Sequence, residues 1–142
     1  MIEKYGSAVW SGTIKGGSGK VATESGVLDN VRYGFTQRFE GEPGTNPEEL
    51  AGAAHAACFA MALSLQLEQA GMEAEELSAR STVSLDKDGE GFAIKKVHLD
   101  LDAKIPGADE AKFKEAAEAA KAGCPISKLF AGADITLDAK LV

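Results

Sequence analysis

One stretch decides the fold: NPEELAGAAHAACF, residues 46–59. The asparagine, or the threonine before it, can cap a helix, the proline suits its first turn, and the two glutamates favour the positive end of the helix dipole. The pattern predicts a long helix that ends near Gly71, a residue type that often follows a last helical turn. Small side chains over residues 51–57 let another backbone approach closely, so we expect Cys58 to lie where helices cross.

The segments on either side have the patterns of strands and shorter helices. Strands are predicted over residues 7–13, 20–24, 26–40, 79–86, 92–105 and 135–141, and 79–86 forms an antiparallel hairpin with 92–105. Helices are predicted over residues 109–122 and from Cys124 to about residue 130. No repeat or linker interrupts the chain. We therefore expect a single α+β domain, residues 1–142, with N-terminal antiparallel strands, a long central helix, a β-hairpin, helices and a final strand.

Composition excludes several classes of partner. The chain has 142 residues, 44% of them hydrophobic and 26% charged, as in ordinary globular proteins. Its net charge of −7 argues against nucleic acid or an anionic membrane as a partner, because both require a basic surface. His55, Ser64 and Gln66 interrupt the apolar residues of the central helix, which favours a buried helix over a membrane span. With no secretory signal and only two cysteines, the cytoplasm is the expected location.

Neither a phosphate-binding loop nor a metal site is predicted. The loop KGGSG, residues 15–19, lacks the glycine that a P-loop requires five places before its Gly-Lys pair, and it joins two predicted strands. His55 and Cys58 form a lone H-x-x-C pair, with His98 and Cys124 distant in the sequence, and this spacing matches no structural zinc site. We expect no metal and no bound cofactor.

The two cysteines are the candidate reactive groups. Taken singly, each is most simply a buried core residue. Cys124 precedes a proline at a predicted helix start, where the helix dipole favours a thiolate. Cys58 lies mid-helix among apolar residues that raise the pKa of a thiol, so its reactivity requires a nearby cation. Arg38, flanked by Phe35 and Phe39, is the candidate cation, and a solvated strand arginine is the alternative.

Glu48 indicates how two copies of the helix could meet. Ten helical residues separate it from Cys58 by about 15 Å, too far for a direct contact. If two copies cross antiparallel at Ala53, the midpoint between the two residues, Glu48 of one chain faces Cys58 of the other. This hypothesis requires a symmetric dimer, and the alternative is that Glu48 only complements the helix dipole.

With these residues assembled, the chain closely resembles the OsmC/Ohr family of thiol-dependent hydroperoxide reductases, and its OsmC branch in particular. The matching stretches cover nearly the whole chain: TESGVL (23–28), YGF (33–35), RFEG (38–41), TNPEEL (45–50), HAACF (55–59) and AGCP (122–125). The resemblance implies that Cys58 is the peroxidatic cysteine and Cys124 the resolving one. It also implies that Arg38 stabilises the thiolate and that Glu48 is the carboxylate partner of Arg38. Phe39, Met61 or Phe130 are our own candidates for apolar walls that would favour alkyl peroxides over hydrogen peroxide.

The resemblance further implies an intertwined homodimer with active sites at the subunit interface. The expected chemistry is reduction of an organic hydroperoxide through a Cys58 sulfenic acid, followed by a Cys58–Cys124 disulfide. An external dithiol, such as the dihydrolipoyl group of a lipoylated protein, would then reset the disulfide by exchange.

Two other functions remain open from the residues alone. The chain could be a non-catalytic ligand-binding or interaction domain whose cysteines are core residues. It could also be a Cys-His hydrolase, because His55 lies one turn before Cys58. No pattern places an orienting Asn or Asp beside His55, so a packed, hydrogen-bonded histidine is the favoured interpretation.

Overall fold

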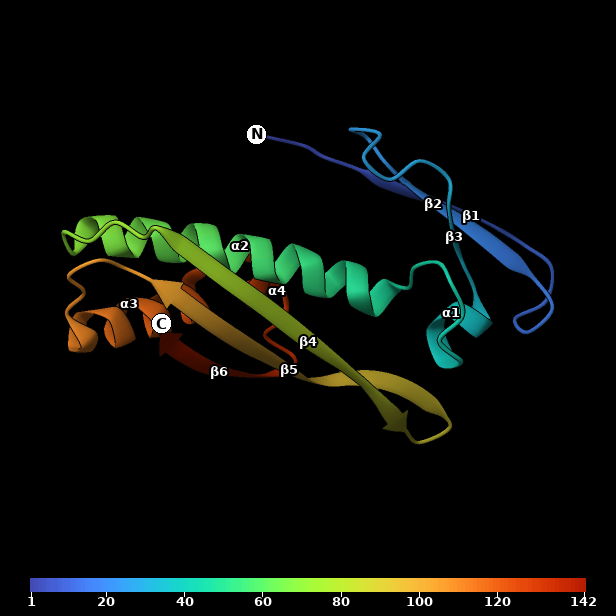
Figure 1. The fold of residues 1–142 in the computed structure, drawn as a ribbon. Helices are drawn as coiled ribbons and strands as arrows, with labels where there is room; N and C mark the ends of the chain where they lie inside the picture. Colours follow the sequence, from blue (N-terminus) through green and yellow to red (C-terminus); the bar gives the residue numbers. More distant parts are fainter. The chain divides into compact units, whose positions relative to one another are not determined.

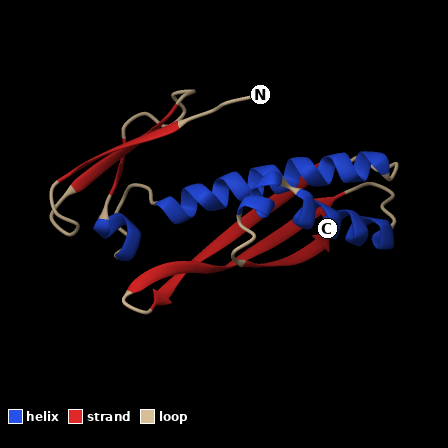
Figure 2. Cartoon of the chain, turned by 180° about the vertical axis from the view of Figure 1, so that it is seen from behind, coloured by secondary structure: helices blue, strands red, loops and turns tan.

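The computed structural model describes residues 1–142 and divides them into two compact units, residues 1–50 and 51–142. The strands are β1 (Gly6–Ser11), β2 (Ser18–Thr23), β3 (Val31–Tyr33), β4 (Glu76–Asp88), β5 (Gly91–Lys104) and β6 (Asp134–Leu141). The helices are α1 (Phe35–Phe39), α2 (Pro47–Gln69), α3 (Glu110–Gly123) and α4 (Pro125–Leu129) (Figure 1). Strands and helices are mixed along the chain, with two small sheets, a long helix and a final strand (Figure 2). The predicted α+β class is confirmed.

The first unit holds an antiparallel sheet in the order β1-β2-β3. The glycine-rich loop joins β1 to β2, which confirms the prediction of a hairpin in place of a phosphate-binding loop. Gly19 is buried beneath two aromatic rings: a Cβ there would lie 2.4 Å from the ring of Tyr33 and 2.8 Å from that of Trp10. These two rings pack with their centroids 5.7 Å apart, so a glycine at this position lets the sheet close around them.

The predicted strand over residues 26–40 is wrong in its second half, because the chain turns into α1 after β3. Phe35 and Phe39 are four residues apart, a spacing that fits one face of a strand and one face of a helix equally well. In the helix their rings pack with centroids 4.8 Å apart. Arg38 is therefore a helical residue in the last turn of α1, and the strand alternative for it is excluded.

The second unit holds a sheet in the order β4-β5-β6. The sequence did not predict the direction in which β6 runs relative to β5. β4 and β5 form the predicted antiparallel hairpin, with a register shift between Ser84 and Leu85. β6 pairs with β5 in parallel, from Lys96 opposite Asp134 to Ala103 opposite Leu141. Parallel neighbours need a crossover connection, and α3 and α4 provide it between β5 and β6.

Helices cover one face of this sheet, and the core lies between the two layers (Figure 2). Phe59, Leu63 and Leu67 of α2 are fully buried, as are residues of β5 and α3. The α2 backbone approaches β4 closely at Gly52, where a Cβ would lie only 2.7 Å from the carbonyl oxygen of Ser81. This contact positions α2, and with it Cys58, over the sheet.

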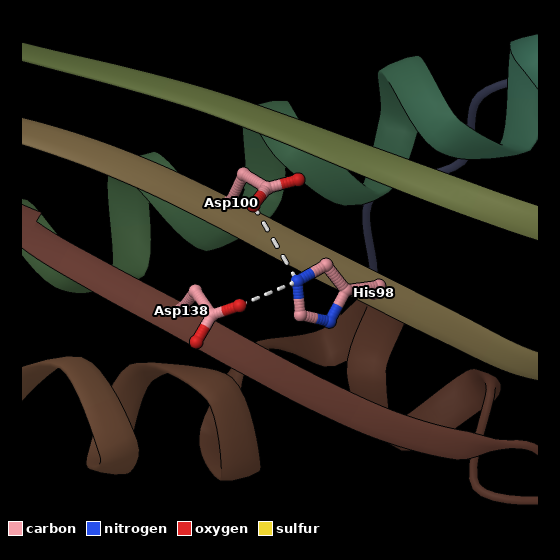
Figure 3. Close-up of side chains that lie close together, drawn as sticks. All are labelled: His98, Asp100 and Asp138. Carbon is pink, nitrogen blue, oxygen red and sulfur yellow. Dashed lines mark ion pairs between the residues drawn. The ribbon is translucent and has the colours of Figure 1, made fainter.

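The opposite face of the sheet is polar and carries a histidine between two carboxylates (Figure 3). His98 Nε2 lies 3.1 Å from Asp138 Oδ2 and 3.4 Å from Asp100 Oδ1, and the other ring nitrogen bonds to Thr136 Oγ1 at 2.5 Å. Asp100 and Asp138 are direct cross-strand partners, which places two like charges side by side on this face. These residues could also hold a metal ion, as their ligand atoms lie within 4.8 Å of one another.

The helix α2 is long and apolar enough to cross a membrane by length and composition alone. The core helix of a soluble protein passes the same test, and Gly52, His55, Phe59, Leu63 and Leu67 of α2 are buried in the protein. Its opposite face is exposed, including Met61 (75%) and Leu65 (52%). The prediction of a buried helix therefore describes one of its two faces.

Candidate active site

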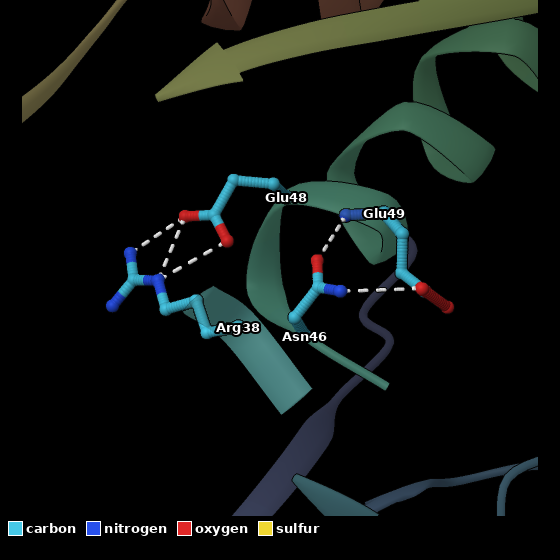
Figure 4. A network of polar contacts seen from close by, with 4 residues as sticks. All are labelled: Arg38, Asn46, Glu48 and Glu49. Carbon is cyan, nitrogen blue, oxygen red and sulfur yellow. Dashed lines mark hydrogen bonds and ion pairs between the residues drawn. The ribbon is translucent and has the colours of Figure 1, made fainter. Parts of the chain in front are cut away.

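Arg38 and Glu48 form a bidentate ion pair in the first unit (Figure 4). Arg38 Nε donates to both carboxylate oxygens at 3.1 Å, and Nη2 donates to Oε1 at 2.6 Å. A planar guanidinium presents two parallel donors that match a carboxylate, which fixes the orientation of Arg38. The Glu48 side chain is only 12% exposed and that of Arg38 is 36% exposed, so the guanidinium keeps an open side.

The start of α2 holds Glu48 in place. Asn46 Oδ1 accepts a 2.8 Å hydrogen bond from the backbone N–H of Glu49, and Asn46 Nδ2 donates to Glu49 Oε1 at 3.2 Å (Figure 4). Thr45 Oγ1 donates to Glu49 Oε2. The predicted cap, the proline in the first turn and the acidic first turn are all confirmed. This cap fixes the helix end that carries Glu48.

An apolar cavity opens beside Arg38 within the first unit. It has a volume of about 240 Å³ and is lined by Trp10, Ile14, Tyr33, Gly34, Phe35, Arg38, Phe39 and Pro47. Of the three candidate apolar walls, only Phe39 lies here, with its ring centroid 5.6 Å from the guanidinium carbon of Arg38. Met61 is exposed on α2, and Phe130 packs edge-on against the ring of His55. Arg38 is the one cation among the lining residues.

Cys58 and Cys124 are both free thiols, and the second unit brings them together. Their side chains lie close enough for each thiol to shift the pKa of the other. Cys58 is half-buried, whereas Cys124 is fully buried in the core. Burial raises the pKa of Cys58, the backbone at Ile126 opposes that rise, and the neighbouring Cys124 adds to it. The raised pKa of Cys58 is the direction that the sequence predicted for a thiol in apolar surroundings.

For Cys124, the effects that lower the pKa of the thiol exceed those that raise it. Burial alone would raise the pKa of its thiol, but interactions with Ser127, with Cys58 and with the backbone outweigh burial and lower the pKa. The backbone N–H of Ser127 donates to Cys124 Sγ at 3.3 Å, so the sulfur caps the short helix α4. Cys124 is therefore the more acidic of the two thiols within this unit.

The sequence missed the surroundings of His55, which is fully buried. Its Nδ1 lies 2.8 Å from Ser81 Oγ on β4, and its Nε2 lies 2.8 Å from Ser127 Oγ on α4. Both ring nitrogens are thus taken up by serines, which confirms a packed, hydrogen-bonded histidine and leaves no nitrogen for Cys58. No spacing in the sequence indicates these partners, because they lie 26 and 72 residues away.

The buried His55 predicts a loss of stability in weak acid. Burial lowers the pKa of His55 below its ordinary value of 6.5, so the unfolded chain binds a proton more readily than the folded one. We expect the contribution of His55 to the free energy of unfolding to be constant above about pH 6.5 and to fall as the pH drops below that value. Urea unfolding of wild type between pH 5.5 and 7.5 measures how the free energy of unfolding depends on pH. The same pH dependence in a His55→Gln variant would contradict the assignment to His55.

The structure thus groups the predicted residues in two pairs. Arg38 and Glu48 belong to the first unit, and Cys58 and Cys124 belong to the second. His55 lies on the helix-covered side of the second unit's sheet, whereas His98 lies on the polar side, so the four scattered His and Cys residues do not gather as ligands.

Comparison with known proteins identifies the family. The model of the OsmC-like protein family matches residues 39–140. The chain is 54% identical to peroxiredoxin OsmC of Escherichia coli over 140 residues, which cover 99% of this chain and 97% of that protein. It is 33% identical to organic hydroperoxide resistance protein OhrB of Bacillus subtilis over 131 residues, 90% and 94% of the two chains.

Solved structures agree with the sequence comparison. The crystal structure of OhrB of Bacillus subtilis superposes with a TM-score of 0.69 at 28% identity and covers 97% of this chain and 98% of that one. An OsmC-like protein from Mycoplasma pneumoniae shares the fold with a TM-score of 0.76 at 16% identity, over 99% and 98% of the two chains. The chain belongs to the OsmC family, as its sequence motifs predicted.

Proposed function

We propose that this chain is a cysteine-based, peroxiredoxin-like enzyme that reduces organic hydroperoxides to alcohols. The observation that carries the proposal is the pair of free thiols that shift each other's pKa, Cys58 half-buried and Cys124 fully buried. A peroxidatic cysteine must be reachable by substrate, whereas its resolving partner needs only to reach the first sulfur. The names of the relatives, a peroxiredoxin and hydroperoxide resistance proteins, support the same chemistry.

In the first step, the Cys58 thiolate attacks the distal oxygen of the hydroperoxide. The O–O bond breaks, the alkoxide takes up a proton and leaves as an alcohol, and the sulfur becomes a sulfenic acid. Burial raises the pKa of Cys58, which disfavours the thiolate that this step requires. A cation must therefore reach Cys58 before it can react at neutral pH.

Arg38 supplies that cation in the proposal. A guanidinium lowers the pKa of a thiolate beside it and offers donors to the negative charge that develops on the leaving oxygen. Glu48 holds Arg38 by two parallel hydrogen bonds, so the guanidinium is oriented before the substrate arrives. The exposed side of Arg38 is the side available to a thiolate and a peroxide.

The apolar cavity beside Arg38 favours a hydroperoxide with an apolar substituent. Aromatic and aliphatic side chains, Trp10, Ile14, Phe35 and Phe39 among them, line it. An alkyl or aryl group would bury apolar surface here, at roughly 25 cal/mol per Å², and hydrogen peroxide has no such group. We therefore assign the substrate to the class of organic hydroperoxides.

Cys124 completes the cycle in the proposal. Its sulfur attacks that of the Cys58 sulfenic acid, water leaves, and a disulfide forms between two cysteines whose thiols already influence each other in the reduced protein. An external dithiol, such as the dihydrolipoyl group of a lipoylated protein, then reduces the disulfide by exchange. No metal or cofactor takes part in any step.

The active enzyme is an intertwined, cytoplasmic homodimer in this proposal, and residues 1–142 act as one functional domain. The exposed face of α2 supports a dimer, because it combines the small Ala53 and Ala57 with the apolar Met61 and Leu65. Two copies that cross antiparallel at Ala53 would bring Glu48 of one chain to Cys58 of the other.

The proposed crossing makes Ala53 a sensitive position. A glutamate placed there would put a charge between two closely packed helices, so we expect Ala53→Glu to sediment as a monomer and to lose most of its peroxidase activity. Ala111→Glu, at an exposed site on α3, is the matched control and should remain dimeric and active. Wild type that sediments as a monomer at micromolar concentration would exclude the crossing.

The proposed substrate class is tested by a steady-state assay with a dithiol reductant. Wild type should consume cumene hydroperoxide with a higher kcat/KM than hydrogen peroxide, about tenfold or more if the cavity binds the aryl group. Phe39→Ala should reduce this preference, because it removes one wall of the cavity. Equal kcat/KM values for the two peroxides would contradict the assignment of the cavity.

A further inference from the structure

A hydrogen-bonded chain of four side chains runs from β4 to the buried thiol in the second unit. Cys124 Sγ lies 3.3 Å from Ser127 Oγ, Ser127 Oγ lies 2.8 Å from His55 Nε2, and His55 Nδ1 lies 2.8 Å from Ser81 Oγ. The described chain has no buried side-chain nitrogen or oxygen without a partner. Each side chain in this hydrogen-bonded chain therefore has a partner, and donor and acceptor can be assigned at each link.

The donors and acceptors have a consistent direction along this chain. The Cys124 thiol donates to the Ser127 hydroxyl, and that hydroxyl can then donate to His55 Nε2. His55 Nε2 must then be unprotonated, and Nδ1–H donates to Ser81 Oγ. A neutral imidazole at the end of the chain is a proton acceptor that faces the thiol through one hydroxyl.

The surroundings keep His55 neutral. Burial lowers its pKa, no charged group contributes to that shift, and the ring lies against the edge of Phe130. The titratable groups that share its network are Cys124 and, through it, Cys58. Nothing in the proposed peroxide step uses His55 or Ser127.

We propose that His55, acting through Ser127, accepts the proton of Cys124 when Cys124 attacks the oxidised Cys58. This inference rests on the proposed peroxidase function and adds a positioning residue to it. A thiol is a poor nucleophile until it loses its proton, and a buried thiol has no bulk water to take that proton.

The proposed proton transfer and disulfide formation conserve atoms and electrons. The S–H bond of Cys124 breaks, and its proton moves to Ser127 Oγ while the Ser127 proton moves to His55 Nε2. The S–S bond forms, the S–O bond of Cys58 breaks, the Cys124 sulfur is oxidised, and the Cys58 sulfur is reduced. The departing hydroxide is neutralised by the proton that His55 gives up, so the products are the disulfide and one water molecule. The imidazole returns to its neutral form.

The same groups assist the reductive half of the cycle. Cys124 leaves the disulfide as a thiolate that the Ser127 hydroxyl and backbone N–H can both stabilise. The half-buried Cys58 is the sulfur that an external thiol can reach, and Cys124, with the lower pKa, is the better leaving group.

The test separates the two oxidative steps in a single turnover. Reduced enzyme is mixed with one equivalent of cumene hydroperoxide between pH 6 and 9, and a dimedone-type trap and mass spectrometry follow sulfenic acid and disulfide with time. The variants are His55→Gln, which can keep a hydrogen bond to Ser127 but is no base, and Ser127→Ala, which breaks the chain. His98→Gln is the matched control on the polar face of the sheet, and Ser127→Thr should restore the hydroxyl.

We expect sulfenic acid to form at the wild-type rate in both variants, with disulfide formation slowed about 10- to 100-fold near pH 7. The deficit should close at high pH, where Cys124 ionises unaided, and Ser127→Thr should recover most of the rate. Disulfide formation at the wild-type rate and with the wild-type pH profile would overturn the relay, as would a deficit that is equal at every pH. Absence of both sulfenic acid and disulfide in wild type would instead overturn the peroxidase, and the relay with it.

A measurement on wild type covers the case in which the variants do not fold. Nitrogen-15 NMR of the reduced enzyme at pH 7 should show His55 as the neutral tautomer with the proton on Nδ1. A proton on Nε2, or a doubly protonated ring, would overturn the relay, because Nε2 could not then accept from Ser127.

Discussion

Replacing Cys58 by serine is expected to abolish peroxide reduction. A serine hydroxyl keeps the size of the thiol but ionises far less readily and is a much weaker nucleophile toward oxygen, so kcat/KM should fall by about a thousandfold or more. The half-buried position of Cys58 tolerates this substitution, and the fold should survive it. The measurement is dithiol-dependent consumption of cumene hydroperoxide at pH 7.

Cys124→Ser is the informative companion to Cys58→Ser. It should consume one equivalent of peroxide at the wild-type rate and stop at the sulfenic acid, because no second sulfur is in reach. A burst without turnover in Cys124→Ser, and no burst in Cys58→Ser, assigns the two roles. Full turnover by Cys58→Ser would remove the basis of the peroxidase. Wild-type protein that consumes no peroxide and whose two thiols stay unreactive would favour a non-catalytic domain.

Replacing Arg38 by alanine should have the second largest effect. Without a guanidinium, the raised pKa of Cys58 leaves little thiolate at neutral pH, so the rate of sulfenic acid formation should fall about 100- to 1,000-fold. The loss should be smaller at alkaline pH, because Cys58 ionises there without help. Arg38→Lys restores the charge without the paired donors and should recover only part of the rate.

Two further variants test the role of Arg38: Glu48→Gln changes its partner, and Arg80→Ala serves as a control. Glu48→Gln keeps the shape of the partner but removes its charge, which should loosen the guanidinium and cost less than Arg38→Ala. Arg80→Ala is the matched control, because Arg80 lies on the polar face of the second sheet. An Arg38→Ala variant with an unchanged pH–rate profile would show that this guanidinium has no part in activating Cys58.

The sequence predicted what depends on local chemistry. The cap at Asn46, the acidic first turn of α2 and the glycine after its end are recognisable because each acts within a few residues. The β4–β5 hairpin was predictable because alternation and turn residues are also local signals. The direction of the Cys58 pKa followed from its apolar neighbours along the helix.

The errors and omissions have a common physical origin in contacts between distant residues. The helix α1 was mistaken for a strand because Phe35 and Phe39 fit both periods, and only their packing in the fold decides between them. The parallel pairing of β6 depends on a crossover whose direction no single segment encodes. His55 finds Ser81 and Ser127 through the tertiary fold, so the chain of hydrogen bonds to Cys124 is visible only in the structure.

Whether Cys58 and Cys124 form one redox pair can be measured by intact-mass and peptide mass spectrometry of reduced wild type after one equivalent of cumene hydroperoxide. We expect full consumption of the peroxide, a loss of about 2 Da from the protein, and one linked peptide pair that contains Cys58 and Cys124. Two free thiols with the peroxide unconsumed, or a stable sulfenic acid on Cys58 with Cys124 still reduced, would contradict this pairing.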